Sequence, residues 1–440
     1  MSGIARLMLS HGEKVSGSDL KRTPITQELE KLGAAVFIGH DGRNVKGAGL
    51  IVYSSAIKED NPEMIEAKRL NIPVIKRAQA LAELMKDKSV ITVTGSHGKT
   101  TTASLVSCLL MEAGMCPTVA IGGILRNIEN NACLGKGDYF VAEADESDGS
   151  FLYYKPKYSI ITNIDYEHLD HYKDFKAEVE AFGEFINKTE QGGCLFCCSD
   201  DENLRSLLER YRGKYLSFGF NKADVYPENI TMEGLTSEFD CKYRGKLVGR
   251  FRLALGGRHN ISNALSVIAL GLELGIGLDA IKRSLSNYKG SGRRTEIKFR
   301  DKEYLVIDDY AHHPTEIKAT LEAVRNLKAG RIIAVFQPHR YTRTQLLWDR
   351  FGPSLDLADH CIITDIYPAS EPPIEGIDAP RLAEMVRKSS GAKKVEYLKK
   401  DDIAGHIMKI VRPGDLVVTL GAGDIVKVSD ELVERFSGKR

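Results

Sequence analysis

The feature that most constrains this chain is the alternation, along its whole length, of short apolar runs with longer amphipathic runs. The short runs are rich in β-branched residues and predict strands, for example 89–95, 304–309 and 415–423. The longer runs, such as 313–330 and 378–391, have the spacing of helices that bury one face. Strands that alternate with helices predict mostly parallel sheets covered by helices, so the expected fold class is α/β throughout.

The length of 440 residues suggests about three domains. We place them at 1–87, 88–292 and 293–440, with the charged, glycine-rich segment 289–296 as a hinge. We expect the first and third to be Rossmann-like and the central one to resemble a P-loop ATPase. Residues 2–10 predict a helix with no strand before it, whereas such a sheet begins with a strand and a glycine turn. A helix that simply comes first is the alternative.

The composition excludes several classes of protein. The 61 Lys and Arg residues balance 60 Asp and Glu, so no global field attracts nucleic acid or an anionic membrane. No segment has the length of an apolar transmembrane helix, and the first residues lack signal-peptide features. Eight cysteines are too few for a disulfide framework, and we expect a cytoplasmic enzyme. The cluster of Cys194, Cys197 and Cys198 favours a buried strand over the start of a zinc site.

The strongest local signal is a strand, a glycine loop and a helix within residues 89–114. A nucleoside triphosphate needs close backbone N–H groups at a helix N-terminus, a lysine at its β and γ phosphates and a hydroxyl on Mg²⁺. The loop supplies these in order, although Val93 stands where the full P-loop motif has its first glycine. The pattern favours ATP binding over a plain strand-to-helix turn. The residues concerned are Gly95, Ser96, His97, Gly98, Lys99, Thr100 and Thr101.

The next two strands end in carboxylates and histidines, at the edge of a parallel sheet where ligands bind. Glu143 lies inside an apolar run, where an unpaired carboxylate is costly, and is the best candidate for a Mg²⁺ ligand. Asp165, His168 and His171 follow the second strand, and His168 taken alone fits a hydrogen-bonded loop histidine better than a Mg²⁺ ligand. A solvated acidic loop is at least as good an interpretation for Asp145, Glu146 and Asp148.

Two further clusters have side chains suited to a nucleotide. Asn260 and Asn263 are three residues apart, which places both on one face of a helix that opens near His259. Their amides suit a purine or a phosphate, and helix capping is the alternative for Asn260. Arg293 and Arg294 lie beside the hinge and suit a polyphosphate, with a solvated charge pair as the alternative.

Taken together, these pieces resemble the Mur ligase family, the ATP-dependent amide ligases that build the peptidoglycan stem peptide. The shared motifs are TGSHGKTTT, AEADESDGSF, TNIDYEHLD, GGRHNISNA and GSGRRTE, in that order along the chain. Four third-domain motifs resemble the branch of the family that adds L-alanine. They are DDYAHHPTEI, FQPHRYTRT, DIYPASEPPIEGI and LGAGDI.

The resemblance implies roles for individual residues. The resemblance implies that Lys99 binds the phosphates. It also implies that Thr100, Glu143 and His168 are the ligands of two Mg²⁺ ions. The implied nucleotide contacts are Asn260, Asn263, Arg294 and, near the ribose, Asp308 or Asp309. The implied contacts to the reacting carboxylate and the amino acid are His339, Arg340 and Arg343.

The resemblance also implies a reaction in peptidoglycan precursor synthesis. ATP phosphorylates the carboxylate of UDP-N-acetylmuramate, and L-alanine attacks the resulting acyl phosphate. Ligation of another amino acid or of a recycled peptide is one alternative, and a regulatory module that binds ATP without ligating is another. We expect a monomer or weak homodimer, with no nucleic acid and no membrane as partner.

The first domain departs from the family pattern. The alanine ligases open with a strand and a glycine run ahead of M-S-G-I-A, whereas this sequence begins at the methionine of that motif. The glycine loop expected to hold the uridine diphosphate is therefore not in the sequence. We expect an upstream segment to be missing, and a variant with a reduced first domain is the alternative.

Overall fold

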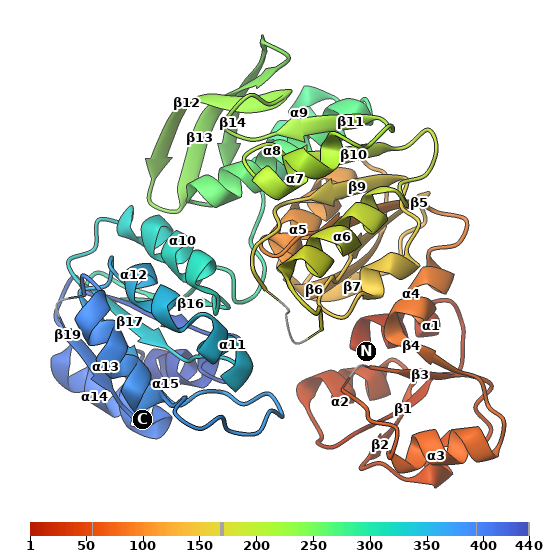
Figure 1. The fold of residues 1–440 in the computed structure, drawn as a ribbon, viewed down its shortest axis with the longest axis horizontal. Coiled ribbons are helices and arrows are strands. Elements are labelled where there is room, and N and C mark those ends of the chain that lie inside the picture. Colours follow the sequence, from red (N-terminus) through yellow and green to blue (C-terminus); the bar gives the residue numbers. More distant parts are fainter. Residues whose placement is uncertain (55, 168–170, 393, 439–440) are drawn as a thin grey trace. The chain divides into compact units, whose positions relative to one another are not determined.

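The computed structural model describes residues 1–54, 56–167, 171–392 and 394–438. They form two compact units, whose helices and strands are labelled in Figure 1. Unit 1 comprises Met1–Tyr226 and Leu265–Ser284, and unit 2 comprises Pro227–Ala264 and Leu285–Arg440. Helices and strands alternate in both, which confirms the predicted α/β class. Within the described ranges, no helix has both the length and the apolar character needed to cross a membrane.

The first part of unit 1 consists of short elements. They are α1 (Ser2–Ser10), β1 (Ser16–Asp19), α2 (Pro24–Lys31), β2 (Ala35–Ile38), β3 (Ile51–Tyr53), α3 (Pro62–Arg69), β4 (Val74–Lys76) and α4 (Arg77–Leu84). Strand β1 pairs in parallel with β2, and β3 with β4, as two separate two-stranded sheets. The side chains of Thr23 and Asn61 cap α2 and α3, and a proline is the first residue of each helix.

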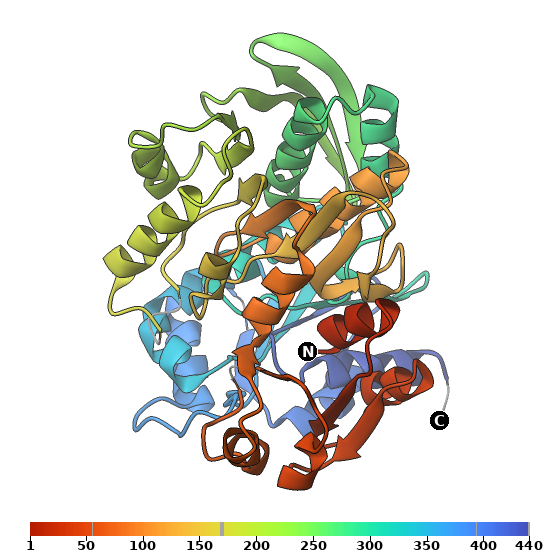
Figure 2. The same ribbon diagram turned by 90° about the vertical axis from the view of Figure 1, so that its right-hand side faces the viewer.

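Helix α1 confirms the helix predicted for residues 2–10. It buries Ile4 and Leu7, and a Cβ atom at Gly3 would lie 3.3 Å from the Cβ of Ala132 in strand β7 (Asn130–Cys133). The apolar face of α1 therefore packs against the edge of the large sheet of unit 1. Figure 2 shows this helix beside the N-terminal mark.

The large sheet of unit 1 has the neighbour order β11-β10-β9-β5-β8-β6-β7. Its strands are β5 (Ser89–Thr94), β6 (Thr118–Leu125), β7, β8 (Tyr139–Glu143), β9 (Tyr158–Ile161), β10 (Cys194–Cys198) and β11 (Tyr215–Phe218). The helices that follow these strands are α5 (Lys99–Glu112), α6 (Phe175–Ile186) and α7 (Glu202–Leu208). All pairings are parallel except β6 with β7.

Strand β5 lies at the centre of this sheet and determines where its loops lie. It pairs in parallel with β8 on one side, where Val93 faces Glu143, and with β9 on the other, where Thr94 faces Ile161. The loops after all three strands therefore emerge at one edge, as the sequence predicts for the glycine loop and the acidic strand ends. Strand β10 is fully buried, which confirms the interpretation of its three cysteines as a buried strand.

Unit 2 contains a three-stranded segment and a six-stranded sheet. The segment consists of β12 (Val225–Glu233), which begins in unit 1, β13 (Thr236–Tyr243) and β14 (Lys246–Leu253). Helix α8 (Arg258–Glu273) then continues into unit 1, and α9 (Leu278–Ser286) leads from unit 1 back into unit 2. The six-stranded sheet has the order β15-β16-β20-β17-β18-β19, and β15 alone is antiparallel to its neighbour. Its strands are β15 (Glu296–Arg300), β16 (Leu305–Asp309), β17 (Ile332–Phe336), β18 (His360–Ile363), β19 (Lys394–Tyr397) and β20 (Leu416–Leu420).

Helices cover both faces of the six-stranded sheet. They are α10 (Pro314–Arg325), α11 (Tyr341–Leu346), α12 (Phe351–Ser354), α13 (Ala379–Ser389), α14 (Lys400–Ile410) and α15 (Val426–Phe436). One apolar core lies beneath α10, α12 and α13, and a second lies beneath α14 and α15. Adjacent residues of each strand point into opposite cores, as Ile332 and Ile333 do, which is why these strands are apolar throughout.

Candidate functional site

The glycine loop joins β5 to α5 and has the conformation that the sequence predicts. Gly95 has a φ of +124°, and a Cβ atom there would lie 2.3 Å from the Thr162 hydroxyl oxygen. Gly98 has a φ of +86° and immediately precedes the first residue of α5. Both positions therefore require glycine, because a side chain would be strained at each and would clash at Gly95.

Hydrogen bonds to the end of β9 hold this loop in place. The Ser96 N–H donates to the Asn163 carbonyl oxygen (3.0 Å), and the His97 N–H donates to the Asn163 side-chain oxygen (2.9 Å). The His97 carbonyl accepts from the Thr162 hydroxyl (2.6 Å) and from the Asn163 amide (3.0 Å). The first N–H groups of α5 have no acceptor within the helix, so they form a ready anion site.

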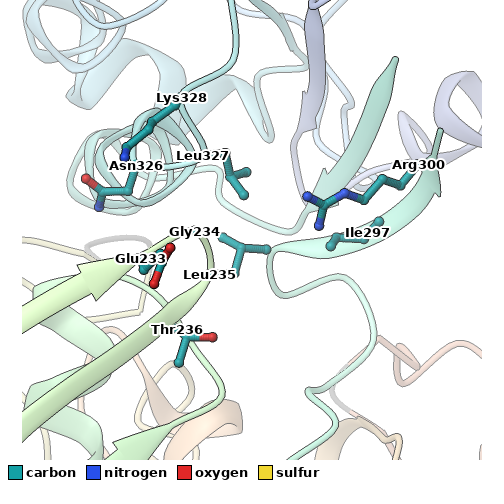
Figure 3. Close-up of a pocket in the computed structure, with 9 residues that line it drawn as sticks. All are labelled: Glu233, Gly234, Leu235, Thr236, Ile297, Arg300, Asn326, Leu327 and Lys328. Carbon is teal, nitrogen blue, oxygen red and sulfur yellow. The ribbon is translucent and has the colours of Figure 1, made fainter. Parts of the chain in front are cut away.

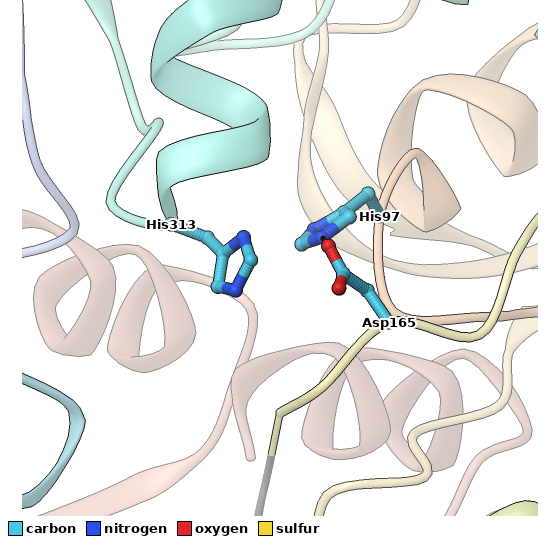
Figure 4. A group of neighbouring side chains, drawn as sticks. All are labelled: His97, Asp165 and His313. Atoms are coloured by element: carbon cyan, nitrogen blue, oxygen red, sulfur yellow. Dashed lines mark hydrogen bonds and ion pairs between the residues drawn. The ribbon is translucent and has the colours of Figure 1, made fainter. Parts of the chain in front are cut away.

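The side chain of His97 makes a second connection to the same segment. Its Nε2 lies 3.0 Å from Asp165 Oδ2, and both side chains are largely buried (Figure 4). The Asp165 N–H also donates to the Ser96 hydroxyl oxygen at 2.8 Å. In this structure His97 and Asp165 therefore brace the loop. Figure 4 also labels His313, a residue of unit 2 that caps α10.

The Lys99 ammonium lies folded over its own loop. Its Nζ donates to the carbonyls of Gly95 (2.7 Å) and Ser96 (3.1 Å) and pairs with Glu146 Oε1 at 2.6 Å. Burial on its own would lower the pKa of Lys99, but the nearby carboxylates, above all Glu146, raise it above its usual value. Lys99 is therefore a fixed positive charge at the mouth of the loop.

Glu146 is a site residue that the sequence reasoning underrated. Its side chain is fully buried, so the interpretation as part of a solvated acidic loop is wrong for this residue. Its carbonyl accepts a 2.6 Å hydrogen bond from the hydroxyl of Tyr172, itself almost fully buried. Asp145 and Asp148 are partly buried and form local turns with Ser147 and Ser150. The pairing of Glu146 with Lys99, 47 residues away, becomes visible only in the folded chain.

Thr100 and Glu143 both face the glycines of strand β6. The Gly122 N–H donates to Glu143 Oε1 at 2.8 Å, and a Cβ atom at Gly122 would lie 2.7 Å from Glu143 Oε2. A Cβ atom at Gly123 would lie 2.8 Å from the Thr100 methyl carbon. A side chain on either glycine would overlap Glu143 or Thr100, so the glycines of β6 let these two residues lie against the strand. The Glu143 carboxylate and the Thr100 hydroxyl are hard oxygen ligands of the kind that Mg²⁺ prefers.

His168 and His171 are the first two histidines that follow strand β9 in the sequence. His168 lies outside the described residues. His171 is exposed, and its ring packs edge-on against Tyr172 with a centroid distance of 4.8 Å.

Asn260 and Asn263 lie in the first turns of α8, and both are buried. Asn263 Nδ2 lies 3.4 Å from Asn260 Oδ1, which confirms that the two amides share one helix face. Asn260 Nδ2 also donates to the Gly256 carbonyl at 2.8 Å. This amide therefore has a local structural partner within unit 2. Neighbouring His259 is exposed.

Arg293 and Asp308 form a buried pair at the entry to the six-stranded sheet. Arg293 Nε donates to Asp308 Oδ2 at 2.8 Å, and its other nitrogens donate to the carbonyls of Gly421 (2.6 Å) and Gly423 (3.1 Å). Asp308 also accepts from the Thr419 hydroxyl at 2.6 Å. This interaction ties residues on the strand ends together, and it replaces the solvated charge pair that was the alternative for Arg293.

Asp309 and Arg294 lie beside that pair. Asp309 accepts from the backbone N–H groups of Thr295 (2.7 Å) and Ala311 (2.8 Å). Burial raises the pKa of Asp309 above its usual value, an effect opposed by the Arg294 charge and these hydrogen bonds. The Arg294 guanidinium lies 4.9 Å from the centroid of the Tyr310 ring, a cation–π geometry.

His339 lies in what we call the imidazole cluster, formed by His312, His339, Arg343 and Tyr367. The ring of His339 stacks on Tyr367 (centroids 5.6 Å apart, planes at 8°) and meets the ring of His312 edge-on at 5.5 Å. Arg343 Nη1 donates to His339 Nδ1 at 3.0 Å. Tyr367 was not among the predicted site residues, although it lies within the motif DIYPASEPPIEGI.

Arg340 adjoins the imidazole cluster. Its backbone has a φ of +66°, and its N–H donates to the Tyr367 carbonyl at 2.8 Å. The guanidinium lies 3.9 Å from Glu371, whose carboxylate also accepts from Thr342. A positive φ is uncommon for a residue other than glycine, so the backbone at Arg340 is held in a strained conformation.

A separate cavity of about 430 Å³ lies within unit 2 (Figure 3). Three segments line it: the turn between β12 and β13, strand β15, and the residues after α10. The lining residues are Glu233, Gly234, Leu235, Thr236, Ile297, Arg300, Asn326, Leu327 and Lys328. They differ from the candidate residues above, so the cavity is not part of the predicted site.

Comparison with known protein families gives matches along nearly the whole chain. Residues 1–89 match the Mur ligase family, catalytic domain. Residues 93–271 match the Mur ligase middle domain, and residues 293–423 match the Mur ligase, glutamate ligase domain.

Curated relatives match the chain from end to end. The UDP-N-acetylmuramate–L-alanine ligase of Geotalea uraniireducens is 45% identical over 440 residues, covering 100% of this chain and 96% of the relative. The enzyme of the same name from Sulfurihydrogenibium is 46% identical, covering 100% and 96%.

Solved structures agree with these relatives. The UDP-N-acetylmuramate-alanine ligase of Thermotoga maritima is similar with a TM-score of 0.86 at 29% identity, covering 100% of this chain and 97% of that one. A murein peptide ligase from Psychrobacter arcticus is similar with a TM-score of 0.71 at 25% identity, covering 98% and 95%.

Proposed function

The chain belongs to the Mur ligase family, and from that premise we propose that it joins L-alanine to the carboxylate of UDP-N-acetylmuramate in an ATP-dependent step of peptidoglycan precursor synthesis. Relatives of that name, 45% and 46% identical over the whole chain, support the assignment. The observation that carries it is the glycine loop, which hydrogen bonds to the residues after β9 hold in place and over which the Lys99 ammonium lies. We also propose three domains, with boundaries near residues 88 and 293.

The reaction needs ATP because a carboxylate is a poor electrophile. A carboxylate oxygen of the muramate group attacks the γ-phosphorus, the bond to the β-phosphate oxygen breaks, and ADP leaves. The amine of L-alanine then attacks the carbonyl carbon of the acyl phosphate. The C–O bond to phosphate breaks, inorganic phosphate leaves, and the nitrogen loses a proton as the amide forms. The protein must therefore bind charged groups in line and neutralise charge on the phosphoryl group.

The glycine loop and Lys99 are suited to that task. The N–H groups at the start of α5 point out of the first helical turn, where the helix dipole favours an anion. The Lys99 ammonium at present bonds two loop carbonyls and Glu146. We propose that phosphate oxygens replace at least one of these partners when ATP binds, while Glu146 keeps the lysine charged and in place.

The oxygen groups beside the β6 glycines fit Mg²⁺. Thr100 and Glu143 would hold one ion, and Glu143 with His168 would contribute to a second. Bound Mg²⁺ would neutralise phosphate charge. The Gly122 N–H, at 2.8 Å from Glu143 Oε1, orients that carboxylate.

The candidate residues of unit 2 have the charges that the other substrate groups need. We propose that Arg340, Arg343 and His339 bind the reacting carboxylate and the amino acid. We further propose that Arg294 contacts the phosphates, that Asp308 or Asp309 lies near the ribose, and that Asn260 and Asn263 lie on the nucleotide side. The stacking of Tyr367 on His339 supports the first assignment, because it orients the ring that Arg343 contacts.

The first test is the variant Lys99→Ala, assayed by phosphate release in the presence of UDP-N-acetylmuramate and L-alanine. We expect activity to be abolished, since the variant removes the positive charge at the phosphate loop. Lys86→Ala is the matched control, because Lys86 is exposed and forms an ion pair with Glu83, which is also exposed. Near-normal, L-alanine-dependent phosphate release by Lys99→Ala would refute the proposal.

The second test concerns the amino acid. The wild-type chain is assayed side by side with L-alanine, glycine, L-serine and the recycled tripeptide of the peptidoglycan stem. We expect the highest kcat/KM with L-alanine. A higher value with the tripeptide would assign the chain to the reaction named for the Psychrobacter arcticus relative, and nucleotide binding without amide formation would indicate a regulatory module.

A further inference from the structure

Two histidines and a glutamate from three elements of unit 2 meet at one point. His360 is the first residue of β18, Glu396 lies in β19, and His406 lies in α14. In the parallel register Ile362 faces Glu396, so Glu396 lies on the same sheet face as Ile362 and His360. That face is the one covered by α14, whose residues Ile403 and Ile407 pack in the same core as Ile362. Figure 1 shows β19 and α14 at one side of this unit.

The contact geometry is specific. His360 Nε2 lies 2.7 Å from Glu396 Oε1, and His406 Nε2 lies 2.8 Å from the same oxygen. The two imidazole rings are 6.4 Å apart and nearly perpendicular. The His360 side chain is 6% exposed, and those of Glu396 and His406 are 23% and 27% exposed. One carboxylate oxygen and two ring nitrogens therefore converge at a point where His360 is buried and the other two side chains are partly exposed.

We propose that His360, Glu396 and His406 bind a divalent transition-metal ion, with Zn²⁺ as the expected occupant. Two imidazole nitrogens and one carboxylate oxygen are a common ligand set for zinc, whose fourth position takes water. With bonds of about 2.1 Å and tetrahedral angles, ligand atoms are separated by about 3.4 Å. The nitrogens must therefore move away from Glu396 Oε1 by about 0.6 Å, which small side-chain rotations supply.

This site differs from the proposed reaction site of unit 2 in its place on the sheet. His360 stands at the amino end of β18, whereas His339 and Tyr367 follow the carboxyl ends of β17 and β18. Because the strands are parallel, His360 lies at the amino ends of the strands, and His339 and Tyr367 lie beyond their carboxyl ends. The metal would join the edge strand β19 to its neighbour and to α14. It would crosslink an edge strand to the rest of the unit, and its fourth coordination position would be left to water.

Lys394 is the natural competitor of the metal. Its Nζ lies 3.1 Å from Glu396 Oε2, and its side chain is 54% exposed. The ammonium supplies positive charge to the carboxylate when the metal is absent, and its exposure lets it turn into solvent when the metal binds. Removing this charge should therefore strengthen metal binding.

The experiment uses the full-length chain after chelator treatment, with Mg²⁺ in excess, and titrates Zn²⁺ against a chromophoric chelator. We expect one Zn²⁺ per chain that His406→Gln weakens at least about tenfold, as expected for loss of a direct ligand. His11→Gln is the control, because His11 is an exposed histidine at the end of α1. Zinc binding by His406→Gln that equals the wild type would overturn the proposal.

Two further readouts keep the test independent of folding defects. His406 is partly exposed, so the melting temperature of His406→Gln without metal should equal that of the wild type, while Zn²⁺ should raise the melting temperature of the wild type only. Lys394→Gln should bind Zn²⁺ several-fold more tightly than the wild type. A Zn²⁺-induced rise in the melting temperature of His406→Gln, or an affinity of Lys394→Gln no greater than that of the wild type, would contradict the proposed site.

Discussion

The glycine loop of unit 1 and the imidazole cluster of unit 2 are both built at the carboxyl ends of parallel strands, but different parts of the chain hold them. The loop is positioned largely by its own backbone, with positive φ at Gly95 and Gly98 and with the Ser96 and His97 N–H groups donating to the carbonyl and side-chain oxygens of Asn163. The cluster is positioned by side chains, chiefly the stacking of His339 on Tyr367 and the hydrogen bond from Arg343. We infer that the loop is rigid before ATP arrives, whereas the cluster depends on contacts that single substitutions weaken gradually.

The largest expected effect comes from the buried charge pair between Lys99 and Glu146. Glu146→Ala should lower the free energy of unfolding by about 3 to 5 kcal/mol, because it leaves a largely buried ammonium without its partner. Urea denaturation measures this change. Glu83→Ala is the control, since its partner Lys86 is exposed and the expected loss is below about 1 kcal/mol. If the two substitutions lower the free energy of unfolding equally, the buried Lys99–Glu146 pair stabilises the protein no more than the exposed Lys86–Glu83 pair does.

The second prediction tests whether backbone geometry holds the loop. Gly95→Ala should cost about 2 to 4 kcal/mol of stability and abolish ATP turnover, because strain at positive φ adds to a 2.3 Å contact with Thr162. Gly12→Ala separates the two causes, since Gly12 has a φ of +85° and no atom within 4 Å of an added Cβ. It should cost about 1 to 2 kcal/mol. An intact turnover in Gly95→Ala would argue against a rigid loop.

The third prediction concerns the bracing residue. Asn163→Ala removes an acceptor for the His97 N–H and a donor to the His97 carbonyl, so we expect a loss of about 1 to 3 kcal/mol. The loop should loosen, and the KM for ATP should rise more than kcat falls. Asn187→Ala provides the comparison, because Asn187 donates one exposed hydrogen bond to the Gly183 carbonyl. An unchanged KM for ATP would mean that Asn163 does not position the loop.

The smallest expected effect belongs to the imidazole cluster. Tyr367→Leu should remove about 0.5 to 1.5 kcal/mol of stacking on His339 and should appear mainly as a raised KM for L-alanine. Tyr367→Phe keeps the ring and should retain nearly normal values. If the leucine and phenylalanine variants behave alike, the stacking does not position His339.

The same contrast explains how much of the molecule the sequence predicts. The alternation of strands and helices, the loop with its two glycines and the buried strand at Cys194 follow from local rules of periodicity and φ, and the structure has them all. The burial of Glu146 does not follow from local rules, because its partner Lys99 is 47 residues away. An acidic run in a loop is solvated far more often than it is buried.

The sequence also does not show which distant segments pair with one another. The sequence pattern does not show that the strands of the first 87 residues form two separate pairs, nor that α1 packs on β7. Tyr367 joins His339 through a bridge between the ends of β17 and β18, which only the order of strands in the sheet reveals. His360, Glu396 and His406 are likewise separated in sequence and meet only in the folded unit.

The most direct test of the proposed ATP site is a crystal structure of the chain with Mg²⁺ and a non-hydrolysable ATP analogue. We expect Lys99 Nζ within about 3 Å of a phosphate oxygen, the N–H groups at the start of α5 facing the phosphates, and Gly95 and Asn163 in their present positions. An analogue bound elsewhere, or a loop that must refold to admit it, would contradict the assignment of this turn as the triphosphate site.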